Sequence, residues 1–249
     1  MSGRRPLPSR PLVIAHRGAS GERPENTLPA YQLALEQRAD MIEIDLHTTR
    51  DGVIVVTHDA DLAVLGGRGE VAEASLAEVR ALDAGDGLRV PMLDEVLDDF
   101  GGLIPFNIEV KTGDRTGRYA GIELAALAAV DNRGLLESTL FSSFDDPILQ
   151  ELRQLSAGAR IGVLVSPREP RESLAQSLNR AGAVDAEAIN PHFALVDETL
   201  VRAAHGEGLA VCVYTVDAEP EMERLLDLGV DGIFTNHPRR LRAIVDRRV

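Results

Sequence analysis

Residues 41–58 contain the part of the chain best equipped for chemistry. Polar and apolar side chains alternate there, with Glu43, Asp45 and His47 set between Ile42, Ile44 and Leu46. Because successive side chains of a β-strand point to opposite faces, the two carboxylates and the imidazole would share one face. The opposite face would be entirely apolar, so the pattern predicts a strand with one buried face and one chemically active face.

A hairpin turn follows this strand. Asp51-Gly52 is a strong turn signal, and the β-branched residues after it predict a returning strand over residues 53–57. If Asp51 and Gly52 form a two-residue turn, Asp45 lies opposite His58. A three-residue turn would change the parity of the pairing, so this register is a hypothesis.

A third carboxylate falls on a similar strand, predicted over residues 106–111. Glu109 and Lys111 share its polar face. Acids on strands are often exposed and paired with Arg or Lys, whereas three buried acids need a compensating positive charge. One Mg²⁺ or Ca²⁺ bound by Glu43, Asp45 and Glu109 would supply it, because hard cations prefer oxygen ligands. Zinc fits less well, since the chain has no HExxH motif and no cysteine pair.

Two histidines and two cations stand near predicted strand ends. His16 and His58 alone would each be ordinary structural residues, but beside the acids they could act as general acid and general base. Arg17 and Lys111 could bind a phosphate or merely neutralise the carboxylates, and these two roles are compatible.

Several further residues have open interpretations. Glu25 and Asn26 either begin a helix or act in the site, with Glu25 holding Arg17 and Asn26 donating to an anion. His47 is expected to be solvated, because it lies nearest the turn. Other polar and aromatic residues at strand ends are expected to line a pocket: Phe141 to Phe144, Asn190 to His192, Tyr214 and Thr215.

Strands and helices alternate along the whole chain. Strands are also predicted over 12–15, 139–143, 161–165, 186–190, 210–215 and 232–235. Helices are predicted from Asn26 or Thr27 onward and over 76–81, 93–100, 121–131, 145–156, 171–181, 197–206 and 219–228. Without one hairpin arm, eight strands remain, which predicts an α/β fold of the (β/α)8 barrel type with an extra hairpin. A doubly wound sheet is the alternative, but no Gly-rich nucleotide fingerprint follows the first strand.

Composition limits the classes of function. The 249 residues are 44% hydrophobic and carry a net charge of −14, which suits a folded domain and disfavours nucleic acid and anionic lipid as partners. We expect a flexible lead-in over 1–11 and one domain over 12–249, with an insertion over about 59–104. The single Cys212 and the lack of a signal peptide or a spanning segment predict a cytoplasmic protein without stable membrane insertion. The oligomeric state is left open.

Taken together, these motifs resemble the glycerophosphodiester phosphodiesterase family, in its small bacterial single-domain form. The similarity runs from about Leu12 to Pro238 and rests on ten motifs: His16-Arg17-Gly18, Glu25-Asn26-Thr27, Glu43-Ile44-Asp45, Thr49-Arg50-Asp51-Gly52, His58-Asp59, Pro91-Met92-Leu93, Ile108-Glu109-Val110-Lys111, Ser143-Phe144, Gly229-Val230-Asp231-Gly232 and Thr235-Asn236-His237-Pro238.

The resemblance implies a barrel of the triosephosphate isomerase type, with an insertion after the strand of His58. It implies that His16 and His58 form the acid–base pair and that Arg17 and Lys111 contact the phosphate. It also implies one Mg²⁺ or Ca²⁺ on Glu43, Asp45 and Glu109, and glycerol 3-phosphate and an alcohol as products.

Two positions depart from the family pattern. Tyr214 stands where the family often has Trp, in the expected leaving-group pocket, and Asn236 stands where it often has Asp. We expect the Asn236 change to touch no residue of the chemistry. Two alternatives remain open: lysophospholipase D or sphingomyelinase D activity on lipids, and a non-catalytic barrel that binds phosphate esters.

Overall fold

Parallel strands close into a barrel in the computed structural model, which describes residues 9–168 and 173–248. Within these residues the sheet has nine strands, and β1 pairs in parallel with both β9 and β2, which closes the ring. The barrel strands are β1 (Leu12–His16), β2 (Met41–Thr48), β4 (Phe106–Val110), β5 (Thr139–Ser143), β6 (Arg160–Val165), β7 (Ala188–Pro191), β8 (Ala210–Val213) and β9 (Gly232–Thr235). Only β3 (Ile54–Val56) lies outside this ring, so the predicted (β/α)8 barrel with an extra hairpin arm is confirmed.

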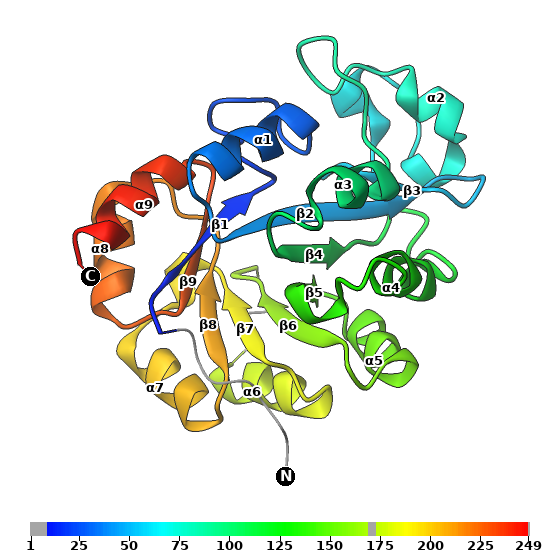
Figure 1. Cartoon of the computed structure of the whole chain (residues 1–249). Coiled ribbons are helices and arrows are strands. Elements are labelled where there is room, and N and C mark those ends of the chain that lie inside the picture. Colours follow the sequence, from blue (N-terminus) through cyan, green and yellow to red (C-terminus); the bar gives the residue numbers. More distant parts are fainter. Residues whose placement is uncertain (1–8, 169–172, 249) are drawn as a thin grey trace.

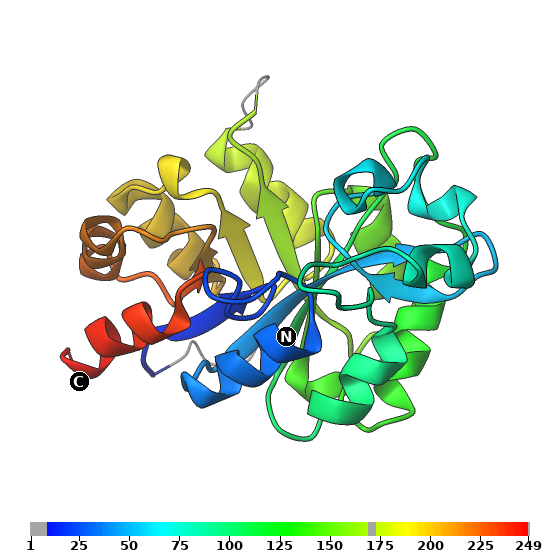
Figure 2. The ribbon, with the colours of Figure 1, turned by 90° about the horizontal axis from the view of Figure 1, so that it is seen from above.

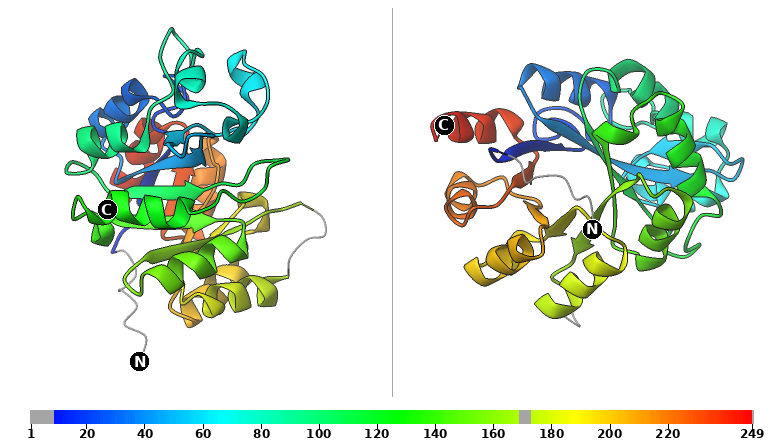
Figure 3. Two further views of the ribbon diagram at one scale, coloured as in Figure 1. Left: turned by 90° about the vertical axis from the view of Figure 1, so that its right-hand side faces the viewer. Right: turned by 60° about the horizontal axis from the view of Figure 1, so that its bottom comes forward.

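One helix follows each barrel strand and packs on its outer side (Figure 1; Figure 3, right). These helices are α1 (Leu28–Glu36), α3 (Leu93–Phe100), α4 (Ile122–Asp131), α5 (Asp146–Leu155), α6 (Leu174–Ala183), α7 (Glu198–Gly206), α8 (Glu219–Asp227) and α9 (Pro238–Asp246). Sequence analysis did not anticipate α9, although Pro238 at its first position is a typical helix start. The first two residues of the helix expected over 171–181 lie outside the described residues.

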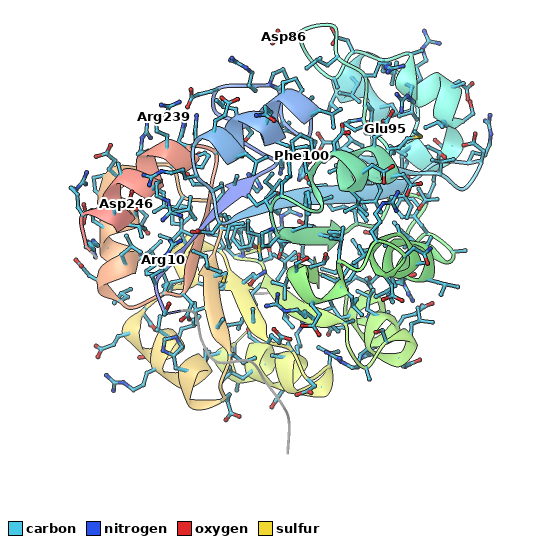
Figure 4. The ribbon with its side chains drawn as sticks, in the orientation of Figure 1. Arg10, Asp86, Glu95, Phe100, Arg239 and Asp246 are labelled. Carbon is cyan, nitrogen blue, oxygen red and sulfur yellow. The ribbon has the colours of Figure 1, made fainter. Side chains whose placement is uncertain are left out.

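The strand β2 is buried on both faces, not on one. Its apolar residues Ile42, Ile44 and Leu46 pack into the main core between barrel and helices, while Glu43 and Asp45 point into the barrel. On the helix side Phe100 of α3 points toward α1 (Figure 4), where its ring meets Tyr31 edge-on at 5.8 Å between ring centres. The acids therefore sit in the barrel interior, which makes the need for compensating charge stronger than the sequence implied.

The hairpin register predicted from a two-residue turn is wrong. Leu46 pairs with Val56 and Thr48 with Ile54, so the turn contains three residues and Asp45 lies level with Thr57. Gly52 closes the turn with φ 82°, a left-handed conformation that glycine adopts without a steric cost. The extra residue changes the parity of the pairing, as a three-residue turn must.

The segment between β3 and α3 forms a small structure beside the barrel (Figures 1 and 2). It contains α2 (Leu76–Arg80) and the short 3-10 helices η1 (Leu62–Leu65) and η2 (Val71–Glu73), and Asp86 lies at its outer tip (Figure 4). It has a core of its own, in which Val55 of β3 packs with the buried residues Leu62, Val71, Ala74, Val79 and Val90. The apolar face of α3 instead belongs to the main core, so α3 is a regular helix of the barrel. The remaining 3-10 helices are η3 (Leu136–Ser138) and η4 (Phe193–Leu195).

Within the described residues, every helix is too short or too polar to cross a membrane.

Candidate active site

A cavity of about 840 Å³ opens at the carboxyl ends of the barrel strands. His16 ends β1, Lys111 follows β4, Ser143 ends β5 and Tyr214 follows β8, and all four line this cavity. The loops at this end of a (β/α)8 barrel carry the active site in nearly all characterised examples. The position alone therefore makes this cavity the candidate site.

The three predicted carboxylates meet at the base of this cavity. Asp45 on β2 is directly paired with Glu109 on β4, and Glu43 lies two residues earlier on the same face. One carboxylate oxygen from each of the three lies within 4.8 Å of the others. Glu43 and Glu109 line the cavity, whereas Asp45 is 1% exposed and does not.

Lys111 and Arg17 lie against these acids. Lys111 Nζ is 2.9 Å from Glu109 Oε1 and 3.1 Å from Asp45 Oδ1. Arg17 Nε is 3.3 Å from Asp45 Oδ2, and the Arg17 backbone N–H donates to Glu43 Oε2 at 2.9 Å. Both cations also line the cavity, so neutralising the acids and facing a ligand are compatible roles.

Two positive charges do not fully compensate three buried carboxylates. Burial and the neighbouring Asp45 and Glu109 charges raise the pKa of Glu43 well above its ordinary value. Burial also raises the pKa of Glu109, against the opposing effect of Lys111. For Asp45, burial acts in the same direction, but Lys111 and Arg17 outweigh it and hold its pKa below the ordinary value.

This arrangement fits one divalent cation. The buried Asp45 Oδ1 accepts no well-directed hydrogen bond from the part of the chain that the structure describes, although Lys111 is close. A cation shared by the three carboxylates would use this oxygen and would lower the pKa of Glu43 and Glu109. An all-oxygen ligand set favours Mg²⁺ or Ca²⁺ over softer metals.

His16 faces the cavity from the end of β1. Its Nδ1 lies 2.8 Å from Asn236 Oδ1, in the loop after β9. Burial, together with the charge of Arg17, lowers the pKa of His16 to about 4, so the ring is neutral at pH 7. The expectation that Asn236 touches no residue of the chemistry is therefore wrong.

His58 reaches the same cavity from the other side of the acids. It follows β3, lies one residue beyond the register position expected for it, and is one-third exposed. Its Nδ1 lies 3.0 Å from Asp59 Oδ1. The loop after the hairpin, and not direct cross-strand pairing, brings His58 to the acids.

His47 is buried, and the expectation that it is solvated is wrong. Its Nε2–H donates to the His58 carbonyl at 3.0 Å, and its Nδ1 accepts from the Tyr119 hydroxyl at 2.5 Å. Burial lowers its pKa to about 4, so it is neutral at pH 7. Neither Tyr119 nor this contact could be found from the sequence, because Tyr119 lies 72 residues away in the chain.

Glu25 and Asn26 act on the protein and do not line the cavity. Both oxygens of Glu25 accept from Arg17 Nη1, at 2.9 and 3.0 Å, so Glu25 does hold Arg17 but through one nitrogen only. Asn26 Nδ2 does donate to an anion, which is Asp45 at 2.8 Å. Thr27 is the residue before α1, but its side chain donates to Pro24 and leaves the helix uncapped.

A cluster of three rings, from Phe144, His192 and Tyr214, lines one wall of the cavity. The Tyr214 ring contacts the rings of Phe144 and His192 edge-on, with ring centres 5.9 and 5.6 Å apart. Tyr214 donates its hydroxyl to the Val165 carbonyl, which fixes the ring. The expectation for the pocket lining is confirmed for Ser143, Phe144, His192, Tyr214 and Thr215. It is wrong for Phe141, Ser142, Asn190 and Pro191, which are buried behind the lining. Asn107 also lines the cavity, from the polar face of β4 that carries Glu109. Further polar lining residues were missed because they lie in loops without a motif: Thr112, Asp114, Asp145, Ser166 and Arg168.

Comparison with known proteins gives consistent matches over this whole region. The sequence pattern of the Glycerophosphoryl diester phosphodiesterase family matches residues 16–240. A Bacillus subtilis glycerophosphodiester phosphodiesterase is 34% identical, covering 93% of this chain and 85% of that protein. One from Caldanaerobacter subterraneus is also 34% identical, covering 94% and 97%. A solved Oleispira antarctica phosphodiesterase in complex with the product sn-glycerol-3-phosphate is 28% identical, with a TM-score of 0.81 over 95% of this chain and 97% of that one.

Proposed function

Because this chain belongs to the glycerophosphodiester phosphodiesterase family, we propose that it hydrolyses glycerophosphodiesters to glycerol 3-phosphate and an alcohol, with one divalent cation and a pair of histidines. The phosphodiesterase activity itself follows from the family. The observation that carries the finer proposal is the meeting of three carboxylates, two histidines and two cations around one cavity. The bound product of the Oleispira relative supports glycerol 3-phosphate as the product here.

The first requirement of this reaction is stabilisation of the negative charge on the phosphate oxygens. Arg17 and Lys111 face the cavity and would stabilise the non-bridging oxygens as negative charge builds up there. Glu43, Asp45 and Glu109 would hold the Mg²⁺ or Ca²⁺, which when bound adds positive charge against the same oxygens.

Proton transfer is the second requirement, and the surroundings of the two histidines differ. His16 is neutral at pH 7 and suits the general base, which takes the proton from the attacking oxygen. His58 is one-third exposed at the opposite side of the acids, with its Nδ1 3.0 Å from Asp59 Oδ1, and we assign it the general acid, which gives a proton to the leaving oxygen. The attacking oxygen bonds to phosphorus, the bond to the alcohol oxygen breaks, and His58 protonates that oxygen. If the attacking oxygen comes from water, glycerol 3-phosphate forms directly. If it comes from the neighbouring glycerol hydroxyl, a cyclic phosphate forms first, and a water molecule then breaks one ring P–O bond to give glycerol 3-phosphate.

Replacing either histidine tests this assignment. We expect His16→Ala and His58→Ala each to lower kcat by about 10²–10⁴-fold on glycerophosphocholine, the usual loss when a general acid or base is removed. His205→Ala is the matched control, because His205 lies on α7 outside the cavity and contacts Asp231. Near-normal turnover by either cavity variant would reject the acid–base pair.

A panel of substrates separates this function from its alternatives. Glycerophosphocholine, glycerophosphoethanolamine and a long-chain lysophospholipid would be compared by release of glycerol 3-phosphate and of free alcohol. We expect the two small diesters to be turned over faster. Faster turnover of the lysolipid would favour a lipid phosphodiesterase, and binding without turnover would favour a non-catalytic barrel.

A further inference from the structure

The loop after β9 holds His16 in one tautomer. We propose that Asn236, oriented by Asp217, is a positioning residue that keeps the proton of neutral His16 on Nδ1 and leaves Nε2 free to accept a proton. The use of this Nε2 as a base rests on the proposed function, whereas the tautomer itself is a property of the folded protein.

Asp217 fixes the orientation of the Asn236 side chain. One carboxylate oxygen of Asp217 accepts from the Asn236 backbone N–H at 2.8 Å and from the Thr235 hydroxyl at 3.1 Å. The other accepts from Asn236 Nδ2 at 2.7 Å. An ionised carboxylate can only accept, so the Asn236 NH2 group must face Asp217. The reverse orientation would place two acceptor oxygens against each other.

This orientation turns Asn236 Oδ1 toward His16. Oδ1 lies 2.8 Å from His16 Nδ1, and an amide oxygen can only accept, so Nδ1 must carry the proton. The Ser20 hydroxyl lies 2.8 Å from Oδ1 and 2.7 Å from the His16 carbonyl, but its single proton serves only one of these acceptors, so the orientation of Asn236 rests on Asp217. The Nε2 atom of a neutral ring then has a free lone pair.

A carboxylate at position 236 could accept the proton of His16 Nδ1 alone, because both of its oxygens are acceptors. With Asn236 at that position, Asp217 is needed to turn the amide oxygen toward His16. An asparagine beside a histidine can present either its oxygen or its NH2 group, and the second choice would move the ring proton to Nε2. A base whose lone pair is on the wrong nitrogen loses most of its activity, as tautomer-disrupting changes in other histidine enzymes show. The bonds from Asp217 remove this ambiguity.

The tautomer can be measured directly by long-range ¹H–¹⁵N spectra of the histidine side chains at pH 7. His16→Gln identifies the His16 signals by their loss. In the unaltered protein we expect the pattern of a neutral ring protonated on Nδ1. A ring protonated on Nε2 would overturn the proposal, and this result needs neither a variant nor a substrate.

Two variants then test which residues hold the tautomer. Asn236→Ala removes the acceptor, and we expect mixed tautomers with a kcat lower by about 10–100-fold, the usual effect of losing a partner behind a functional group. The double variant Asp217→Asn with Asn236→Asp exchanges the two side chains, keeps an acceptor at His16, and should restore the Nδ1–H tautomer and most of the lost kcat. Asn179→Ala, on the exposed surface of α6, is the matched control.

These results separate the two proposals. An unchanged tautomer in Asn236→Ala, or a double variant no better than the single one, would reject the role of Asn236. Correct tautomers in a protein that releases no glycerol 3-phosphate would reject the proposed function and leave the positioning role standing.

Discussion

His47 and Glu43 lie four residues apart on the same face of β2, and both are buried. The alternation of residue types was enough to place them on that face, and the resemblance of the motifs was enough to select Glu43. The sequence could not show which partner each side chain meets, because the contacts of His47 with Tyr119 and of His16 with Asn236 join residues 72 and 220 positions apart. Such contacts depend on tertiary packing. They explain both expectations that failed at this scale, namely that His47 is solvated and that Asn236 touches no residue of the chemistry.

The buried, neutral His47 should make stability depend on pH. Its pKa is about 4 in the folded protein and about 6.5 in the unfolded chain, so between these values only the unfolded chain binds the proton. Acidification from pH 6.5 toward 4 should therefore remove stability, by about 1.4 kcal/mol per pH unit from this group. Urea unfolding at several pH values would show a shallower loss in His47→Gln than in the unaltered protein. Parallel pH dependences in the two proteins would contradict this account.

At the scale of elements, the strands and helices were predictable and their pairing was not. The strands of residues 139–143 and 232–235 were predicted to the residue, because β-branched and apolar runs end at clear polar signals. The hairpin register failed because Asp51-Gly52 fits a two-residue turn and a three-residue turn equally well, and the hydrogen bond from Gly52 to Thr49 decides between them. His58 nevertheless reaches the acids, because the loop after β3 returns to the cavity.

Two glycines at loops of the fold allow a matched test. Gly18 follows Arg17 with φ 84°, and a Cβ there would lie 2.7 Å from the Ala30 backbone carbon of α1. Gly52 has φ 82°, but a Cβ there would meet nothing within 4 Å. Gly52→Ala should cost only the left-handed strain, about 1 kcal/mol, and keep its turnover. Gly18→Ala should cost more and also displace Arg17 and His16, which lowers turnover; equal effects of the two changes on stability and turnover would refute this.

At the scale of the whole molecule, a strongly acidic protein must bind an anionic ester. The chain carries 40 acidic and 26 basic residues, so its overall field repels the substrate. The barrel brings three positively charged side chains to one cavity, those of Arg17, Lys111 and Arg168, which attract the substrate locally. A cation bound by the three acids would add to this positive charge. The fold class could be predicted because strand and helix alternate throughout, whereas the placement of α3 in the main core could be seen only in the structure.

Cation binding should therefore stabilise the whole protein. A ligand that binds only the folded state at 100 times its Kd adds about 2.7 kcal/mol, which for a chain of this size raises Tm by roughly 5–10 °C. Thermal unfolding with and without excess Mg²⁺ or Ca²⁺ would measure this shift. Glu43→Gln should lose most of it, whereas Glu36→Gln on the exposed side of α1 should keep it. A full shift in Glu43→Gln would place the cation elsewhere.

The release of glycerol 3-phosphate from glycerophosphocholine, before and after removal of divalent cations by a chelator, tests the central claim most directly. If Glu43, Asp45 and Glu109 share a cation that the reaction needs, turnover will fall to a small fraction on chelation and return when Mg²⁺ or Ca²⁺ is added in excess. Turnover that continues unchanged in the cation-depleted protein would contradict the account.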